Sequence, residues 1–170
     1  MKKILIFGIL LFGTQALSAQ GVKIGFIYSD SVLISMPEYE EAKNKIETYS
    51  KQLSAQLQSK GQEFEEKAKD FEANAGTWAE PIVADKRDEL VRLENNIRDF
   101  QQQAETKLRN KENEVLNPLY AKIETAIKEI AAAENYDFVT PSQVFLFANE
   151  DHNLTDKIIA KLGGTKPTGN

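Results

Sequence analysis

The sequence has no cysteine, a single histidine and no long apolar run after its first residues. Without cysteine there is neither a disulfide framework nor a lipid-modified cysteine, which excludes disulfide-rich secreted domains and lipoproteins. The single histidine, His152, stands beside Asp151 in a polar stretch, and it supplies neither a metal site nor a catalytic triad by itself. We therefore expect no catalytic, cofactor-binding or metal-binding residues, and no enzyme.

Basic residues are fewer than acidic residues. The chain has 21 Lys and Arg residues against 26 Asp and Glu residues, a formal net charge of -5. Removal of Lys2 and Lys3 with a leader would leave 19 basic against 26 acidic residues and a charge of -7. Such an acidic protein is not expected to bind nucleic acid.

The N-terminus has the pattern of a signal peptide. Two lysines precede the apolar run Ile4–Phe12, and small residues follow up to Ala19. The run is shorter than the roughly 20 apolar residues that span a bilayer. We predict a signal peptide over residues 1–19, cleaved between Ala19 and Gln20 or one residue earlier, and a mature protein in the periplasm.

The middle of the chain predicts two long helices that pair as an antiparallel coiled coil. Apolar residues recur at spacings of three and four among charged and amide side chains, which is typical of a coiled-coil stripe. A Ser35–Glu38 capping box is expected to start the first helix, and Asn74, Gly76 and Pro81 to reverse the chain. The predicted stripe includes Tyr39, Ala42, Ile46, Tyr49 and Leu53 before the reversal, and Ile82, Leu90, Leu93, Ile97, Phe100, Ala104 and Leu108 after it.

The stripe is interrupted once in each helix. Two consecutive spacings of four occur at Leu53-Leu57-Gly61 and again at Phe100-Ala104-Leu108. Folding the chain near Pro81 places these interruptions opposite each other, as an antiparallel pair requires if the apolar stripes are to stay in contact. The same spacings also arise by chance in weak stripes, so this is an expectation for the structure to test.

Both ends of the mature chain contribute to a small base. We expect a strand at Val22–Tyr28, a hairpin of strands at Tyr136–Thr140 and Val144–Ala148, and a terminal helix at Leu154–Leu162 capped by Asn153. Pro118 should kink the second long helix where it enters the base. The predicted organisation is a base of residues 20–37 and 118–163, an arm of 38–117 with its tip near 76–81, and a disordered tail of 164–170.

Motifs at both ends resemble the Skp (OmpH-like) family of periplasmic chaperones. The N-terminal motifs are Val22–Ile27, Ser31–Leu33 and Met36–Tyr39, and the C-terminal motifs are Tyr136–Val139 and Leu154–Ile159. The resemblance covers nearly the whole mature chain, and Pro118 fits it as well. It implies an α+β fold in which a long antiparallel coiled-coil hairpin projects from a small β-rich trimerisation base, giving a jellyfish-shaped homotrimer.

The resemblance also implies a function. Three helical arms would enclose unfolded outer-membrane proteins and prevent their aggregation before insertion, without ATP. Carried over by position, the trimer interface would involve Ile24, Phe26, Val139, Phe145 and Phe147. From the apolar residues toward the predicted tip, and not from the resemblance, we expect contact with the unfolded client at Phe64, Phe71, Trp78, Ile82 and Val83.

Some family members use basic arms to meet acidic lipid or lipopolysaccharide. In this chain residues 70–89 hold only Lys86 and Arg87 against six acidic residues, which does not favour that contact. Two alternatives remain open from the sequence. Trp78 either plugs the turn at the tip or presents an apolar patch to a partner, and the chain could instead be a structural adaptor of the cell envelope that docks one folded partner.

Overall fold

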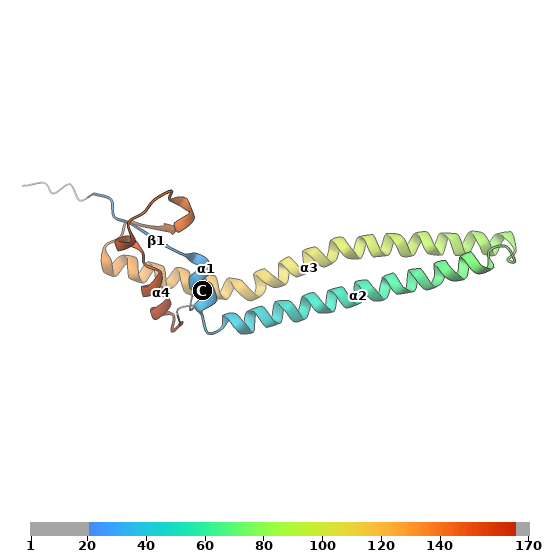
Figure 1. Cartoon of the computed structure of the whole chain (residues 1–170), viewed down its shortest axis with the longest axis horizontal. Coiled ribbons are helices and arrows are strands. Elements are labelled where there is room, and N and C mark those ends of the chain that lie inside the picture. The colour runs from blue at the N-terminus through green and yellow to red at the C-terminus, as the bar shows by residue number, and fades with distance from the viewer. Residues whose placement is uncertain (1–20, 166–170) are drawn as a thin grey trace, which may run out of the picture.

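The computed structural model describes residues 21–165, and the predicted signal peptide lies outside them. Figure 1 shows a compact base at one end and a long two-helix arm at the other. The elements in chain order are β1 (Ile24–Ile27), α1 (Ser29–Ser35), α2 (Tyr39–Asn74), α3 (Glu80–Glu134), β2 (Phe138–Pro141), the 3-10 helices η1 (Ser142–Val144) and η2 (Glu150–His152), and α4 (Thr155–Lys161).

Helices α2 and α3 form the arm. They lie side by side and run in opposite directions, with the reversal between Asn74 and Glu80 (Figure 1). Pro81 occupies the first turn of α3, where its missing amide hydrogen costs nothing. Helix α3 continues through Pro118 into the base, and its path bends where the colour passes from yellow to orange.

The two interrupted stretches of the apolar stripe face each other, as predicted. Leu53 and Leu57 of α2 line the same hollow as Ala104 and Leu108 of α3. The stripe is wrong at one position, because Val83 is 9% exposed whereas Ile82 is 46% exposed. Val83 precedes Leu90 by seven residues, a full heptad, and Ile82 is out of that repeat by one residue.

The core of the base unites both ends of the described chain. Residues from β1, α1, the base end of α3 and α4 form one buried cluster, and Ala42 of α2 joins it. Gly25 of β1 is part of this arrangement, because a Cβ there would lie 2.8 Å from the side chain of Leu154. The cluster comprises Ile27, Val32, Leu33, Met36, Ala42, Leu119, Ile123, Ala126, Leu154, Ile158 and Ile159.

The predicted C-terminal hairpin is wrong. β2 pairs in parallel with β1, with Ile24 opposite Phe138, and Val144–Ala148 forms no strand within the described chain. The segment after Pro141 enters a 3-10 turn instead. A strand at Val144–Ala148 would have apolar side chains on both faces, and both faces would have to be buried. The described part of a single copy of the chain has no second layer of structure to bury them.

The predicted capping box is also wrong. Ser35 belongs to the last turn of α1, where its buried hydroxyl donates a hydrogen bond to the carbonyl of Ser31. The Glu38 carboxylate accepts a hydrogen bond from Lys122 of α3, and α2 begins at Tyr39 without a side-chain cap. Lys122 therefore occupies the carboxylate that the predicted capping box would have used to accept a backbone amide.

Asn153, predicted to cap the terminal helix, lies one residue before the N-cap of α4, which is Leu154 and has no side-chain cap. Asn153 Oδ1 accepts a hydrogen bond from the amide of Thr155 at 3.0 Å, in the first turn of α4. Gly163 ends the helix with a left-handed backbone (φ 70°). The amides of Gly164 and Thr165, the first residues of the predicted tail, donate to the carbonyls of Ile159 and Ser35. Residues 166–170 lie outside the described residues.

Candidate functional site

The tip of the arm carries three of the five residues predicted to contact a client. Trp78, in the loop between the helices, packs edge-on against Phe71 of α2, with ring centroids 6.1 Å apart. Ile82 is exposed nearby in the first turn of α3. The other two lie apart from them, since Val83 points into the seam and Phe64 is half-buried about two turns before Phe71.

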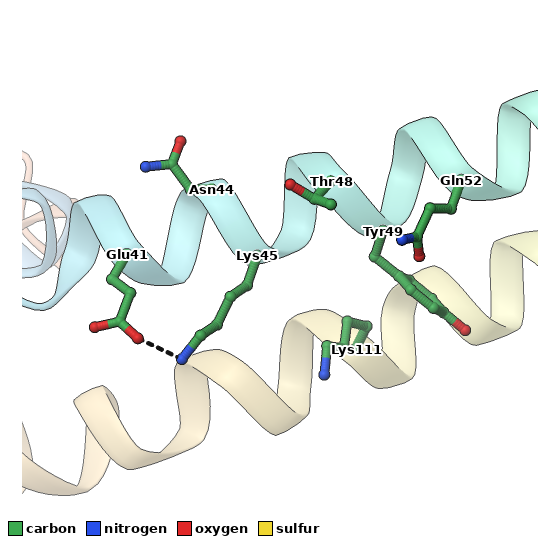
Figure 2. Close-up of a pocket in the computed structure, with 7 residues that line it drawn as sticks. All are labelled: Glu41, Asn44, Lys45, Thr48, Tyr49, Gln52 and Lys111. Carbon is green, nitrogen blue, oxygen red and sulfur yellow. Dashed lines mark ion pairs between the residues drawn. The ribbon is translucent and has the colours of Figure 1, made fainter.

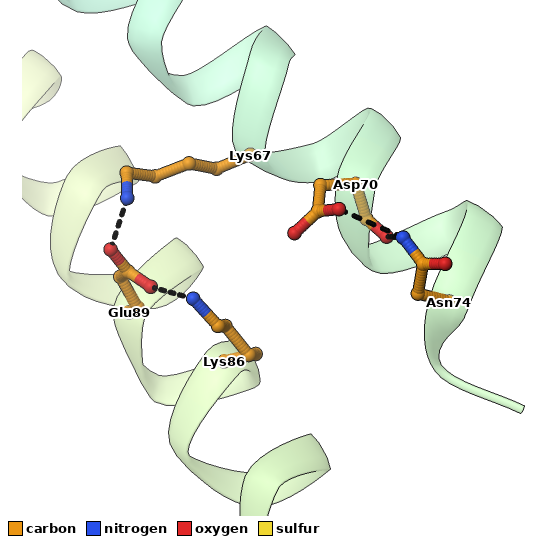
Figure 3. Close-up of polar contacts among 5 residues, drawn as sticks. All are labelled: Lys67, Asp70, Asn74, Lys86 and Glu89. Carbon is orange, nitrogen blue, oxygen red and sulfur yellow. Dashed lines mark hydrogen bonds and ion pairs between the residues drawn. The ribbon is translucent and has the colours of Figure 1, made fainter. Parts of the chain in front are cut away.

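A charged cluster just below the tip joins the two helices. Lys67 of α2 donates to Glu89 of α3 at 2.5 Å, and Lys86 reaches the second oxygen of that carboxylate at 3.3 Å (Figure 3). On α2, Asn74 donates to the side chain of Asp70 at 2.8 Å. We call Lys67, Lys86 and Glu89 the tip clip.

The tip clip perturbs the acid–base behaviour of its members. The hydrogen bonds from Lys67 and then Lys86 hold the pKa of the Glu89 carboxyl below its ordinary value. The same Lys67–Glu89 hydrogen bond raises the pKa of the Lys67 ammonium. The charges of Lys67 and Glu89 are therefore both present across the neutral range, where their ion pair joins the two helices.

Farther down the arm the seam is narrow. Phe100 is buried between the helices, and the ammonium groups of Lys60 and Lys107 lie 5.5 and 5.6 Å from its ring centroid. The two cations interact with the Phe100 ring and cover part of it. The arm is thus stabilised by single anchors and not by a continuous core.

One flank of the seam near the base is polar. A hollow of about 660 Å³ there is lined by Glu41, Asn44, Lys45, Thr48, Tyr49, Gln52 and Lys111 (Figure 2). Glu41 and Lys45 form an ion pair of 2.6 Å, and Lys111 pairs with Glu114 at 2.9 Å. Within residues 21–165, no three His, Cys, Asp or Glu side chains gather as a metal site would require.

The base presents the second candidate surface. Of the residues predicted at a trimer interface, Phe26 is buried against Phe145, with ring centroids 6.2 Å apart. Val139 is half-buried against the core cluster of the base. Ile24 and Phe147 are exposed, at 40% and 87%. The structure therefore divides the predicted set between the inside and the outside of one subunit.

Some exposed apolar residues of the base were not in the predicted set. Phe138, Val144 and Leu146 are 62%, 68% and 109% exposed, and they join Ile24 and Phe147 at the outer side of the sheet and the segment after it. The continuous apolar run from Val144 to Phe147 would have indicated Val144 and Leu146. Phe138 could not be identified in this way, because only its pairing with β1 decides which way it points.

Comparison with known families decides the relationship of the chain. A family model described as "Outer membrane protein (OmpH-like)" matches residues 23–162, nearly the whole described chain. The chain belongs to the OmpH-like family. The predicted family is thereby confirmed, and so is the prediction of a chaperone and not an enzyme, because this is a family of chaperones.

Individual relatives agree with this assignment. The chain is 26% identical to "Chaperone protein Skp" of Vibrio cholerae over 81% of each protein. It is 24% identical to the protein of the same name from Photorhabdus laumondii, over 95% of this chain and 99% of the relative. These matches extend over both the base and the arm of this OmpH-like chain.

A solved structure supports the fold. The crystal structure of a putative outer membrane chaperone (OmpH-like) from Caulobacter crescentus matches with a TM-score of 0.69 over 83% of each chain, at 18% identity. This OmpH-like protein therefore shares its combination of long helices and a small sheet with a relative of very different sequence. Within residues 21–165, no helix is apolar over a length that would cross a bilayer.

Proposed function

We propose that this OmpH-like protein is an ATP-independent periplasmic holdase, which encloses unfolded outer-membrane proteins between the helical arms of a homotrimer. The observation that carries the proposal is the arm. Helix α2 has 36 residues, which corresponds to about 54 Å of length, and within residues 21–165 no globular domain lies along it or at its tip. Such a projection offers a large surface without a fixed pocket.

The arm is suited to many weak contacts. Its buried side chains within the described chain are Ala42 beside the base and, farther out, Leu53, Val83 and Phe100. Charged and amide side chains occupy most of the remaining surface. A thin seam of this kind, in a coiled-coil hairpin, would let the arms flex around chains of different size, and release would follow from competition and would need no hydrolysis.

The exposed apolar surface of the base supports the homotrimer. A two-stranded sheet is marginal alone, and here Phe138 of β2 is exposed, as are Leu146 and Phe147 in the segment that follows. Burial against the same surfaces of two other copies would remove these side chains from water. The proposed interface comprises Ile24, Phe26, Val139, Phe145 and Phe147, extended by Phe138, Val144 and Leu146.

The division of labour along the chain follows from this arrangement. Residues 20–37 and 118–163 would form the trimerisation base, 38–117 the arm, and 164–170 a tail. A signal peptide over residues 1–19, cleaved between Ala19 and Gln20, would deliver the protein to the periplasm. Because the protein has no cysteine, it would need no disulfide-forming enzymes there.

Client contact at the tip would involve Phe64, Phe71, Trp78 and Ile82. Val83 belongs to the same proposed set, but it is 9% exposed and would reach a client only where the helices part. The packing of Trp78 on Phe71 is compatible with both a plug and a patch, since the indole remains half-exposed. Trp78→Ala separates the two roles, because loss of a plug lowers stability and loss of a patch lowers client binding.

The test is suppression of aggregation. Mature protein mixed with a urea-unfolded outer-membrane β-barrel, and diluted without ATP, should keep the barrel protein soluble at near-stoichiometric ratio. Light scattering of the mature protein alone should give the mass of a trimer, and Leu146→Asp should lower that mass. No suppression at several-fold excess, together with capture of one folded envelope protein, would indicate the structural adaptor instead.

A further inference from the structure

A second hollow region runs along the α2–α3 seam, and its lining differs from that in Figure 2. It consists of two adjoining hollows of about 430 and 460 Å³, which share Ser50 and Leu108 and therefore form one groove. We call it the apolar groove. Its apolar lining comprises Tyr39, Ile46, Leu53, Leu57, Ala104, Leu108 and Leu116.

The apolar groove and the hollow in Figure 2 lie on opposite flanks of the seam. On α2 the groove is lined by Lys43, Ser50 and Ser54, whereas Lys45 and Gln52 line the other hollow. With 3.6 residues per turn, these two sets fall on either side of the line of residues that faces α3. The arm therefore has one polar flank and one flank with an apolar floor.

The groove exists because short side chains stand where the repeat is interrupted. Ser50 and Ser54 of α2 face Ala104 of α3 at the level of the two consecutive four-residue spacings. Short side chains and a shifted repeat leave apolar surface uncovered between the helices. The uncovered surface includes the flank of Leu57, which is only half-buried.

The charge on the wall of the groove is unbalanced. Glu105 and Glu112 of α3 line it, seven residues and about 10 Å apart along the helix, and neither has an ion-pair partner within residues 21–165. On the α2 wall, Glu47 is already paired with Lys51 at 2.6 Å, and Lys43 is the one cation among the described residues that line the groove. The groove thus combines aliphatic floor with unpaired negative charge.

We propose that the apolar groove binds an extended segment of an unfolded chain in which Lys or Arg side chains flank aliphatic ones. The inference rests on the proposed holdase function and names the kind of client segment that the arm prefers. From Tyr39 to Leu57 the groove is about 27 Å long, which accommodates roughly eight residues of extended chain. Aliphatic side chains would enter the floor, and cationic side chains would pair with Glu105 and Glu112.

Peptide binding tests the charge preference. The probes are a fluorescent peptide of about eight residues with alternating Lys and Leu, and the same peptide with Glu at each Lys position, measured by anisotropy on the full mature protein. The Lys peptide should bind more tightly. Glu105→Gln with Glu112→Gln should weaken it about fivefold, since two exposed ion pairs are lost.

The matched control removes two charges from the same helix outside the groove. Asp88 and Asp99 are exposed on α3, do not line the groove, and have no ion-pair partner within residues 21–165. Asp88→Asn with Asp99→Asn should change binding of the Lys peptide by less than about twofold at physiological salt, because those charges lie beyond close contact. Equal weakening by both pairs, or none by either, would overturn the proposal.

Position is tested by photo-crosslinking. A benzoylphenylalanine at Ser54 lies in the groove, and one at Gln52 lies on the polar flank. The Lys peptide should crosslink mainly at position 54. Crosslinking of position 54 to a second copy of this chain, or equal yields at both positions, would contradict the assignment.

The aggregation assay separates this proposal from the function on which it rests. Wild-type protein that suppresses aggregation of a barrel protein, while showing no preference between the Lys and Glu peptides, would leave the holdase function standing and refute the groove. Wild-type protein that fails to suppress aggregation would refute both.

Discussion

The base and the arm of this OmpH-like protein use apolar side chains in opposite ways. In the base, residues far apart in sequence, such as Val32, Leu154 and Ile158, are fully buried against one another. In the arm, buried side chains come singly, and charged neighbours such as Lys60 cover what apolar packing leaves open. The base is therefore expected to unfold as one stable unit. The arm exposes a large surface, and its helices should open locally at a lower free energy.

Breaking the core of the base should have the largest effect. Leu154→Ala removes a side chain with 0% exposure and should lower the free energy of unfolding by about 2–5 kcal/mol. Urea denaturation followed by circular dichroism measures this loss. The control is Val91→Ala on the arm, where a 51% exposed side chain should change stability by less than about 0.5 kcal/mol. Similar losses for both variants would remove the distinction between base and arm.

The arm should respond to loss of its central anchor, but locally. Phe100→Ala should cost about 2–3 kcal/mol, below the usual range for a buried Phe, because the flexible side chains of Lys60 and Lys107 cover part of its ring and can fill part of the space. Hydrogen exchange should accelerate in α2 and α3 near Leu53 and Leu57 and stay unchanged in α1 and α4. Faster exchange throughout the base would show that arm and base unfold together.

The contact between the end of α4 and α1 offers a sharper, smaller test. A Cβ at Gly164 would clash with the carbonyl oxygen of Ser35, so Gly164→Ala must displace backbone and should cost about 1–2 kcal/mol. A Cβ at Gly76, at the tip, would meet no atom within 4 Å, and Gly76→Ala should be nearly neutral. Thermal unfolding of the two variants gives the comparison, and a smaller loss at position 164 than at 76 would contradict it.

The smallest expected effect is at the tip clip, and it depends on pH. Because pairing lowers the pKa of Glu89, the stabilisation is present above the ordinary carboxyl pKa of 4.5 and is lost as the pH falls through the lowered value. Because pairing raises the pKa of Lys67, its contribution is present below 10.5 and is lost as the pH rises through the raised value.

Fluorescence of Trp78, the only tryptophan, reports on the tip. Its emission should change on acidification to a pH below the ordinary carboxyl pKa of 4.5, and Glu89→Gln should weaken that change. Glu94→Gln, which breaks a pair with Arg98 within α3, should leave it as in the wild type. Identical acid curves for wild type and Glu89→Gln would show that the clip does not hold the tip.

Local patterns in the sequence determined much of the arm. The reversal near Gly76, the start of α3 beside Pro81 and the facing interruptions at Leu57 and Ala104 all follow from helix period and helix breakers, which act between residues close in sequence. The hydrogen bond from the amide of Thr155 to the Asn153 side chain is local in the same sense, although the N-cap of α4 is Leu154.

The base was decided by contacts that sequence patterns do not encode. Parallel pairing of β1 with β2 joins residues more than a hundred positions apart, and the two apolar stretches of Tyr136–Ala148 fit a hairpin equally well. Glu38 could have capped α2, but its carboxylate is taken by Lys122, a partner that no local helix pattern indicates. The negative charges of Glu105 and Glu112 can be read from the sequence. Their position beside the apolar groove cannot, because it depends on the spacing between α2 and α3, which only tertiary packing determines.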